Sequence, residues 1–147
     1  MERTIVENQP VEVSQRIVRV LEGNCHEQNL CLVKDIMARF GDKWTMYTVL
    51  LLGQNEKLRF NELKNRISGI SQRMLAVTLR SLEEDGMVSR TLFPEVPPRV
   101  EYCLTGLGRG LLDQILQLAG WADSHSREIT AARDAFRQKD TVSGAGT

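Results

Sequence analysis

The chain of 147 residues carries 19 basic and 19 acidic side chains, so its formal net charge is zero, and 41% of its residues are hydrophobic. This length and composition are typical of one soluble globular domain with a single core. The longest uninterrupted apolar run, residues 49–52, is far shorter than the roughly 18 residues that cross a bilayer. The N-terminus also lacks the apolar stretch of a signal peptide. We therefore expect a cytoplasmic protein with no membrane segment.

The three cysteines are Cys25, Cys31 and Cys103, and none has CxxC or Cys/His metal spacing. Reduced thiols are the default in the cytoplasm. We therefore expect no disulfide framework, no metal site and no cofactor.

Charge is unevenly distributed along the chain. Residues 57–99 hold eight basic and five acidic side chains, a net charge of +3, whereas residues 1–30 have a net charge of −2. A basic middle segment can hold phosphate while the whole molecule stays neutral, although a mixed solvated surface gives the same pattern.

The first half of the chain shows helical periodicity with clear stops. We expect a short amphipathic helix over 11–22 and a second helix over 32–40, ended by Gly41. Asp42 is a good N-cap for a third helix over 43–52, with Trp44, Tyr47 and Leu51 facing inward, and 53–55 is expected to be a loop.

A strand stub at Leu58-Arg59 precedes a helix over 60–67 and a turn over 68–71. Ser71 is a favourable N-cap for the next helix, predicted over 72–85, whose buried seam is Leu75, Leu79 and Leu82. Gly86 supplies its left-handed stop.

Residues 87–93 and 99–104 are predicted strands around the stiff loop 94–98, which contains three prolines. Thr105 should cap a last long helix reaching about Phe136, and residues 141–147 are predicted to be a disordered tail. The apolar stripe of this helix is Leu107, Leu111, Ile115, Leu118 and Ala122.

This order of elements predicts a mainly α fold with a small β-hairpin, the plan of a winged helix-turn-helix. The alternative is a small α+β domain with no role in DNA binding.

The helix over 72–85 carries the residues best suited to DNA. Its exposed face holds two arginines, Arg73 and Arg80, with Ala76 and Val77 between them. We expect Arg73 to contact a guanine edge or a phosphate, Ala76 and Val77 to meet thymine methyl groups, and Arg80 to reach the backbone. Free N–H groups at the helix N-terminus, at Ser71, Gln72 and Arg73, attract phosphate.

Two alternatives stay open for the arginines. Arg73 and Arg80 could be solvated or ion-paired, for instance Arg80 with Glu84. Arg90 and Arg99 flank the proline loop and could reach the minor groove or nearby phosphates, but Arg99 could instead pair with Glu95 or Glu101 and only stabilise the hairpin. Because residues 83–85 are all acidic, only the first half of the helix should enter a groove.

Several motifs resemble those of the HxlR family of bacterial regulators over about residues 31–129. They are Gly41-Asp42-Lys43-Trp44-Thr45, Arg59-Phe60-Asn61-Glu62-Leu63, Gly69-Ile70-Ser71, Leu82-Glu83-Glu84-Asp85-Gly86-Met87-Val88, and Pro94 to Tyr102 with Leu104-Thr105. The resemblance implies a MarR-like winged-helix homodimer that binds operator DNA, with the terminal helices forming the dimer interface. It also implies a recognition helix over 71–85 and a wing tip over 94–98. Residues 1–30 would be an N-terminal extension adding to the dimer interface, and 130–147 the helix end and tail.

Some members of that family sense oxidants or electrophiles through a cysteine ahead of their first helix, and Cys31 stands at the family's distance from Lys43-Trp44. In this chain Leu32 follows it in place of the usual proline. Near a helix N-terminus Cys31 could react as a thiolate, with Cys25 as a partner, or it could be a structural thiol.

Two other functions are alternatives to DNA binding. An enzyme is disfavoured because the only histidines, His26 and His125, lie outside the folded middle of the chain, and no nucleophile motif or phosphate loop is present. A winged-helix module that binds protein instead of DNA would fit the zero net charge.

Overall fold

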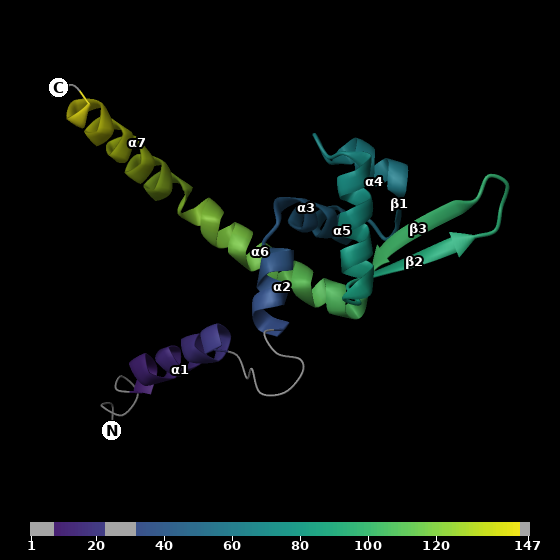
Figure 1. Cartoon of the computed structure of the whole chain (residues 1–147), viewed down its shortest axis with the longest axis horizontal. Helices are drawn as coiled ribbons and strands as arrows, with labels where there is room; N and C mark the ends of the chain where they lie inside the picture. Colours follow the sequence, from purple (N-terminus) through teal and green to yellow (C-terminus); the bar gives the residue numbers. More distant parts are fainter. Residues whose placement is uncertain (1–7, 23–31, 145–147) are drawn as a thin grey trace.

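The computed structural model of the protein describes residues 8–22 and 32–144. Within these ranges it is a mainly helical winged helix-turn-helix, as predicted (Figure 1). The elements in chain order are α1 (Asn8–Glu22), α2 (Leu32–Phe40), α3 (Lys43–Gln54), β1 (Leu58–Arg59), α4 (Phe60–Arg66), α5 (Gln72–Glu84), β2 (Val88–Phe93), β3 (Arg99–Leu104), α6 (Gly106–Ser124) and α7 (Ser126–Ser143).

The core lies where α3, α4 and α5 meet the sheet. Its largest fully buried side chains are five leucines, one valine and one threonine, at Leu52, Leu63, Leu75, Leu79, Leu82, Val49 and Thr48. The predicted seam of α5 is therefore confirmed, since all three of its leucines belong to this cluster. Burying so many branched apolar side chains fixes the rotation of α5 about its own axis.

The sheet has three antiparallel strands in the order β1-β3-β2. Strand β3 is central, with Leu58 opposite Tyr102 on one side and Val88 opposite Leu104 on the other. The sequence alternates Val100, Tyr102 and Leu104 with Arg99, Glu101 and Cys103, which predicts a half-buried strand. Tyr102 and Leu104 are buried as this predicts, whereas Val100 is half-buried. The β2–β3 hairpin projects from the core as the wing (Figure 1).

Three predicted helix caps are confirmed. The side chains of Asp42, Ser71 and Thr105 accept hydrogen bonds from the backbone N–H of Thr45, Met74 and Gly108, at 3.3, 3.0 and 3.1 Å. The Thr105 hydroxyl also donates to the Gly86 carbonyl at 2.6 Å. Gly86 has a φ of +76°, the left-handed stop expected after α5.

Helix α3 differs from its prediction in length and in orientation. It continues through Gln54, so the loop predicted at 53–55 is wrong for its first two residues. Gly53 serves close packing, because a Cβ there would lie 2.4 Å from Leu112 Cδ2 of α6. The buried face is Thr45, Thr48, Val49 and Leu52, whereas Tyr47 is 50% exposed. Since α3 is apolar on most sides, periodicity alone could not choose its inward face.

The predicted final helix is two helices. It breaks at His125, whose Nδ1 bonds to the Trp121 carbonyl at 2.8 Å, and α7 then runs through Ser143, past the predicted end and into the predicted tail. Of the predicted stripe only Ile115 is buried, while Leu107 and Leu118 are 61% and 56% exposed. Leu118 and Ala122 are exposed because α6 leaves the core after crossing α3, and α7 buries none of its described residues.

Two glycines in the first turns of α6 should respond oppositely to alanine. A Cβ on Gly108 would lie 2.0 Å from the Met87 carbonyl oxygen, whereas a Cβ on Gly110 would meet nothing within 4 Å. We expect Gly108→Ala to lower the free energy of unfolding by about 1–3 kcal/mol through backbone displacement. Gly110→Ala should raise it by about 0.5–1 kcal/mol, because alanine favours the helix. Urea denaturation measures both, and equal shifts in the two variants would contradict the close approach.

Candidate nucleic-acid interface

Helix α5 presents two clearly different faces. Leu75, Thr78, Leu79 and Leu82 are buried, while the opposite side exposes Arg73, Ala76, Val77 and Arg80. Val77 is 53% exposed, although an aliphatic side chain on a solvated helix gains nothing from that position. The two faces predicted from the sequence are confirmed as buried and exposed.

The arginines of this exposed face have no carboxylate partner in the part of the chain that the structure describes. Among the described residues neither Arg73 nor Arg80 lies within ion-pair distance of an acidic side chain. Glu84, the partner considered for Arg80, instead lies 3.5 Å from Arg39 of α2. Ion pairing within α5 is therefore not the role of Arg80 in this structure.

The turn before α5 sets where the helix begins. Gly69 adopts a φ of +82°, and Ile70 is 6% exposed and anchors the turn in the core. Ser71 then caps α5 and accepts the N–H of Met74. This leaves the remaining N–H groups of the first turn, together with Gln72 and Arg73, at an exposed helix N-terminus.

The acidic end of α5 is held by one cation from α2. Arg39 hydrogen-bonds to Asp85 and also pairs with Glu84, although Oδ2 of Asp85 is buried with no hydrogen-bond partner. Arg39 thus offsets part of the negative charge at the C-terminus of α5. No local sequence pattern predicts this contact, because the partners are 46 residues apart.

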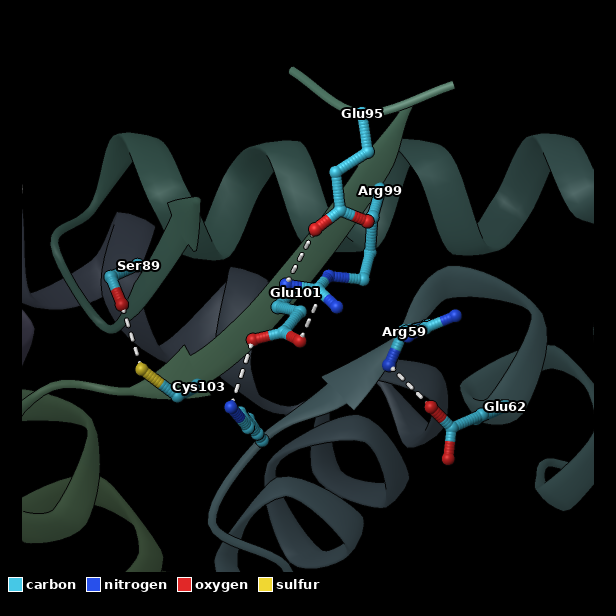
Figure 2. Close-up of polar contacts among 8 residues, drawn as sticks. Arg59, Glu62, Ser89, Glu95, Arg99, Glu101 and Cys103 are labelled. Atoms are coloured by element: carbon cyan, nitrogen blue, oxygen red, sulfur yellow. Dashed lines mark hydrogen bonds and ion pairs between the residues drawn. The ribbon is translucent and has the colours of Figure 1, made fainter. Parts of the chain in front are cut away.

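The wing is stiffened by a charge network around Arg99 and Glu101 of β3 (Figure 2). Glu101 of β3 lies 3.3 Å from Lys57 and 3.3 Å from Arg99, and Arg99 also lies 3.3 Å from Glu95 near the wing tip. The Arg99–Glu101 contact is an ion pair without hydrogen-bond geometry at Nε. The guanidinium also stacks 4.2 Å over Phe93. Arg99 therefore makes the hairpin-stabilising contacts considered as its alternative role, whereas Arg90 is exposed.

The cysteines fall in different parts of the chain. Cys103 is half-buried on β3, with its Sγ 2.8 Å from the Ser89 hydroxyl (Figure 2). Cys31 and Cys25 lie outside the described residues.

Figure 2 also shows Glu62, whose carboxylate accepts the Arg59 N–H at 3.2 Å and so fixes the start of α4.

A family model described as HxlR-like helix-turn-helix matches residues 39–130. The protein belongs to this family. Its matched segment begins at Arg39 and covers the helix-turn-helix, the wing and α6. The resemblance inferred from the motifs is therefore confirmed.

Relatives and solved structures agree with this assignment. The HTH-type transcriptional regulator YtfH of Escherichia coli is 34% identical, over 84% of this chain and 94% of YtfH. The solved structure of ytfH from Salmonella typhimurium is 33% identical, with a TM-score of 0.63, covering 69% of this chain and 89% of that one. The redox regulator HypR in its reduced form is 37% identical, with a TM-score of 0.62, covering 68% and 98%.

These likenesses define the class of protein. The chain is a helix-turn-helix transcriptional regulator and not an enzyme, because the family and its named relatives are regulators. No helix in the described ranges is long and apolar enough to cross a membrane.

Removing the carboxylate of Glu101 should loosen the wing. Its side chain is only 12% exposed and faces both Lys57 and Arg99, so Glu101→Gln should lower the free energy of unfolding by about 1–2 kcal/mol. The matched control is Asp134→Asn on α7, which breaks a pair exposed on both sides and should cost under about 0.5 kcal/mol. Thermal unfolding compares the two, and a control loss as large as that of Glu101→Gln would rule out the network as a stabilising element.

Proposed function

We propose that this regulator is a homodimer that binds operator DNA by placing the first half of α5, residues 71–80, in the major groove. The observation that carries the proposal is the exposed face of α5. It combines two arginines that have no carboxylate partner among the described residues with an exposed Val77, on a helix whose rotation the core fixes. Basic and small apolar side chains together suit the edges of bases in a major groove.

Each residue of this face has a distinct proposed role. Arg73 contacts a guanine edge or a phosphate, Ala76 and Val77 contact thymine methyl groups, and Arg80 contacts the backbone. Ser71 and Gln72 bind a phosphate at the helix N-terminus. The Ser71 oxygen already accepts the Met74 N–H, but its own proton remains available to donate.

The wing supplies a second contact. Arg90 is exposed on β2 and is proposed to bind a phosphate or the minor groove. Arg99 could contact a DNA phosphate only by giving up its ion pair with Glu95 or with Glu101. We therefore propose that Arg99 mainly holds the wing tip in place.

Dimerisation through the terminal helices is supported by their exposed apolar side chains. Ile17 of α1, Met37 of α2, Trp121 of α6 and Phe136 of α7 are each more than half exposed in the single chain. Apolar patches of this kind on a soluble protein mark contact surfaces. A two-fold dimer would place two recognition helices about 34–36 Å apart on a palindromic site.

We also propose that Cys31 senses oxidants or electrophiles. The support is its place directly before α2 and the likeness to HypR, whose structure is described as that of a redox regulator. A thiol near a helix N-terminus has a stabilised thiolate, which is the reactive form.

Operator binding is tested by fluorescence anisotropy with the DNA upstream of the protein's own gene and a scrambled duplex of equal length. We expect tighter binding to the upstream DNA, weakening steeply with salt. Arg73→Ala should weaken it by about 1–3 kcal/mol, because a base contact is lost.

The control variant is Arg127→Ala, which removes an exposed arginine of α7 and should leave the affinity unchanged. Equal affinity of the wild type for both duplexes would overturn the proposed function. A loss of similar size on the scrambled duplex would reassign Arg73 to a phosphate.

The sensing proposal predicts a response confined to one thiol. Treatment with diamide or an α,β-unsaturated aldehyde should change the operator affinity of the wild type and of Cys103→Ser, but not of Cys31→Ser. The same anisotropy assay measures it. Equal responses of wild type and Cys31→Ser would end the sensor role.

A further inference from the structure

A cavity of about 510 Å³ opens between α3 and the C-terminal end of α4, and no residue of α5 lines it. Its volume falls within the range of small-molecule sites. Its lining includes the aliphatic side chains of Leu51 and Ile67 and the aromatic rings of Trp44 and Tyr47. Lys43 and Arg66 stand at its rim.

The charged side chains that line this cavity, Lys43 and Arg66, are both basic. No acidic residue lines it, and among the described residues neither Lys43 nor Arg66 lies within ion-pair distance of a carboxylate. Arg66 Nη1 donates to the side-chain oxygen of Asn55 at 3.1 Å, a neutral amide that positions the guanidinium without neutralising it. Its remaining donors suit a carboxylate, which arginine binds with two parallel hydrogen bonds.

The walls are aromatic and accessible. The rings of Trp44 and Tyr47 meet edge to face, with centroids 6.4 Å apart and an interplanar angle of 71°. Lys43 Nζ lies 4.4 Å from the centre of the Trp44 ring. A half-exposed tyrosine beside a cation-capped indole offers a stacking surface next to positive charge.

We propose that this cavity binds a small planar aromatic carboxylate, with its ring against Trp44 and Tyr47 and its carboxylate toward Arg66 and Lys43. An aliphatic acid would leave the aromatic walls unused, and a neutral aromatic would leave both cations unpaired. The site therefore selects a ligand that has both features.

The same site adjoins the turn that sets the start of α5. Ile67 and Ser68 line the cavity, and a Cβ on Gly69 would lie 3.8 Å from the Trp44 ring. A ligand that shifts the Trp44 ring therefore acts on the turn that leads to Ser71. Bound ligand thus regulates operator binding, a consequence that rests on the function proposed above.

Isothermal titration calorimetry with 1-naphthoate and with its neutral counterpart, 1-naphthalenemethanol, tests the site. We expect saturable binding of the acid and at least about tenfold weaker binding of the alcohol, because charge-assisted hydrogen bonds are lost. Arg66→Gln and Lys43→Gln should each weaken the acid but not the alcohol. Lys64→Gln, on α4 but not lining the cavity, is the matched control and should change neither.

Absence of saturable naphthoate binding, equal affinity for the alcohol, or an equal loss in Lys64→Gln would overturn the site. For regulation, saturating naphthoate should change the wild-type operator affinity at least about fivefold and leave that of Arg66→Gln unchanged. If saturating naphthoate leaves the operator affinity of the wild type unchanged, the proposed regulation is wrong, but the binding site is not. If the ligand-free protein binds no operator, the proposed function fails, while the calorimetry still decides the site.

Discussion

The packing of the leucine seam of α5 is the constraint on which the rest of the structure depends. Leu75, Leu79 and Leu82 are each at most 1% exposed, and together with Leu52 and Leu63 they fill the centre of the domain. A helix with three core leucines on successive turns cannot rotate about its axis without leaving cavities. Each such cavity costs several kcal/mol of stability. The face that carries Arg73, Ala76 and Val77 is exposed as a direct result.

Charge is then placed locally on a molecule that is neutral overall. The cations at the start of α5 and at the rim of the Trp44 cavity have no carboxylate partners among the described residues, whereas Arg99 on the wing and Arg39 beside Asp85 are paired. Paired cations stabilise the fold and unpaired ones are available to anions. Net charge alone could not distinguish the two groups, and for that reason the zero total is compatible with a nucleic-acid partner.

The sequence predicted those elements whose signals are local. Caps at Asp42, Ser71 and Thr105, the stop at Gly86 and the alternation along β3 follow from neighbouring residues, and each is confirmed. The errors involve partners distant in the chain. Gly53 looked like a helix stop, but it makes room for Leu112, and Leu118 matched a core stripe in a helix that has already left the core. The Arg39–Asp85 contact and the cavity between α3 and α4 were not predicted either, because they too join residues that are distant in the chain.

The Thr105 hydroxyl joins three parts of the molecule at one point. It donates to Gly86, which ends α5, and it accepts from Gly108, which presses α6 against the start of the wing. Helix α6 extends from this joint for 19 residues, about 28 Å at the usual helical rise. Helix α6 is therefore held firmly at its N-terminal end and projects from there. In the proposed dimer, a change in the angle between the two α6 helices would reach the C-terminal end of α5 and the base of the wing together. The spacing and the tilt of the two α5 helices would then change together.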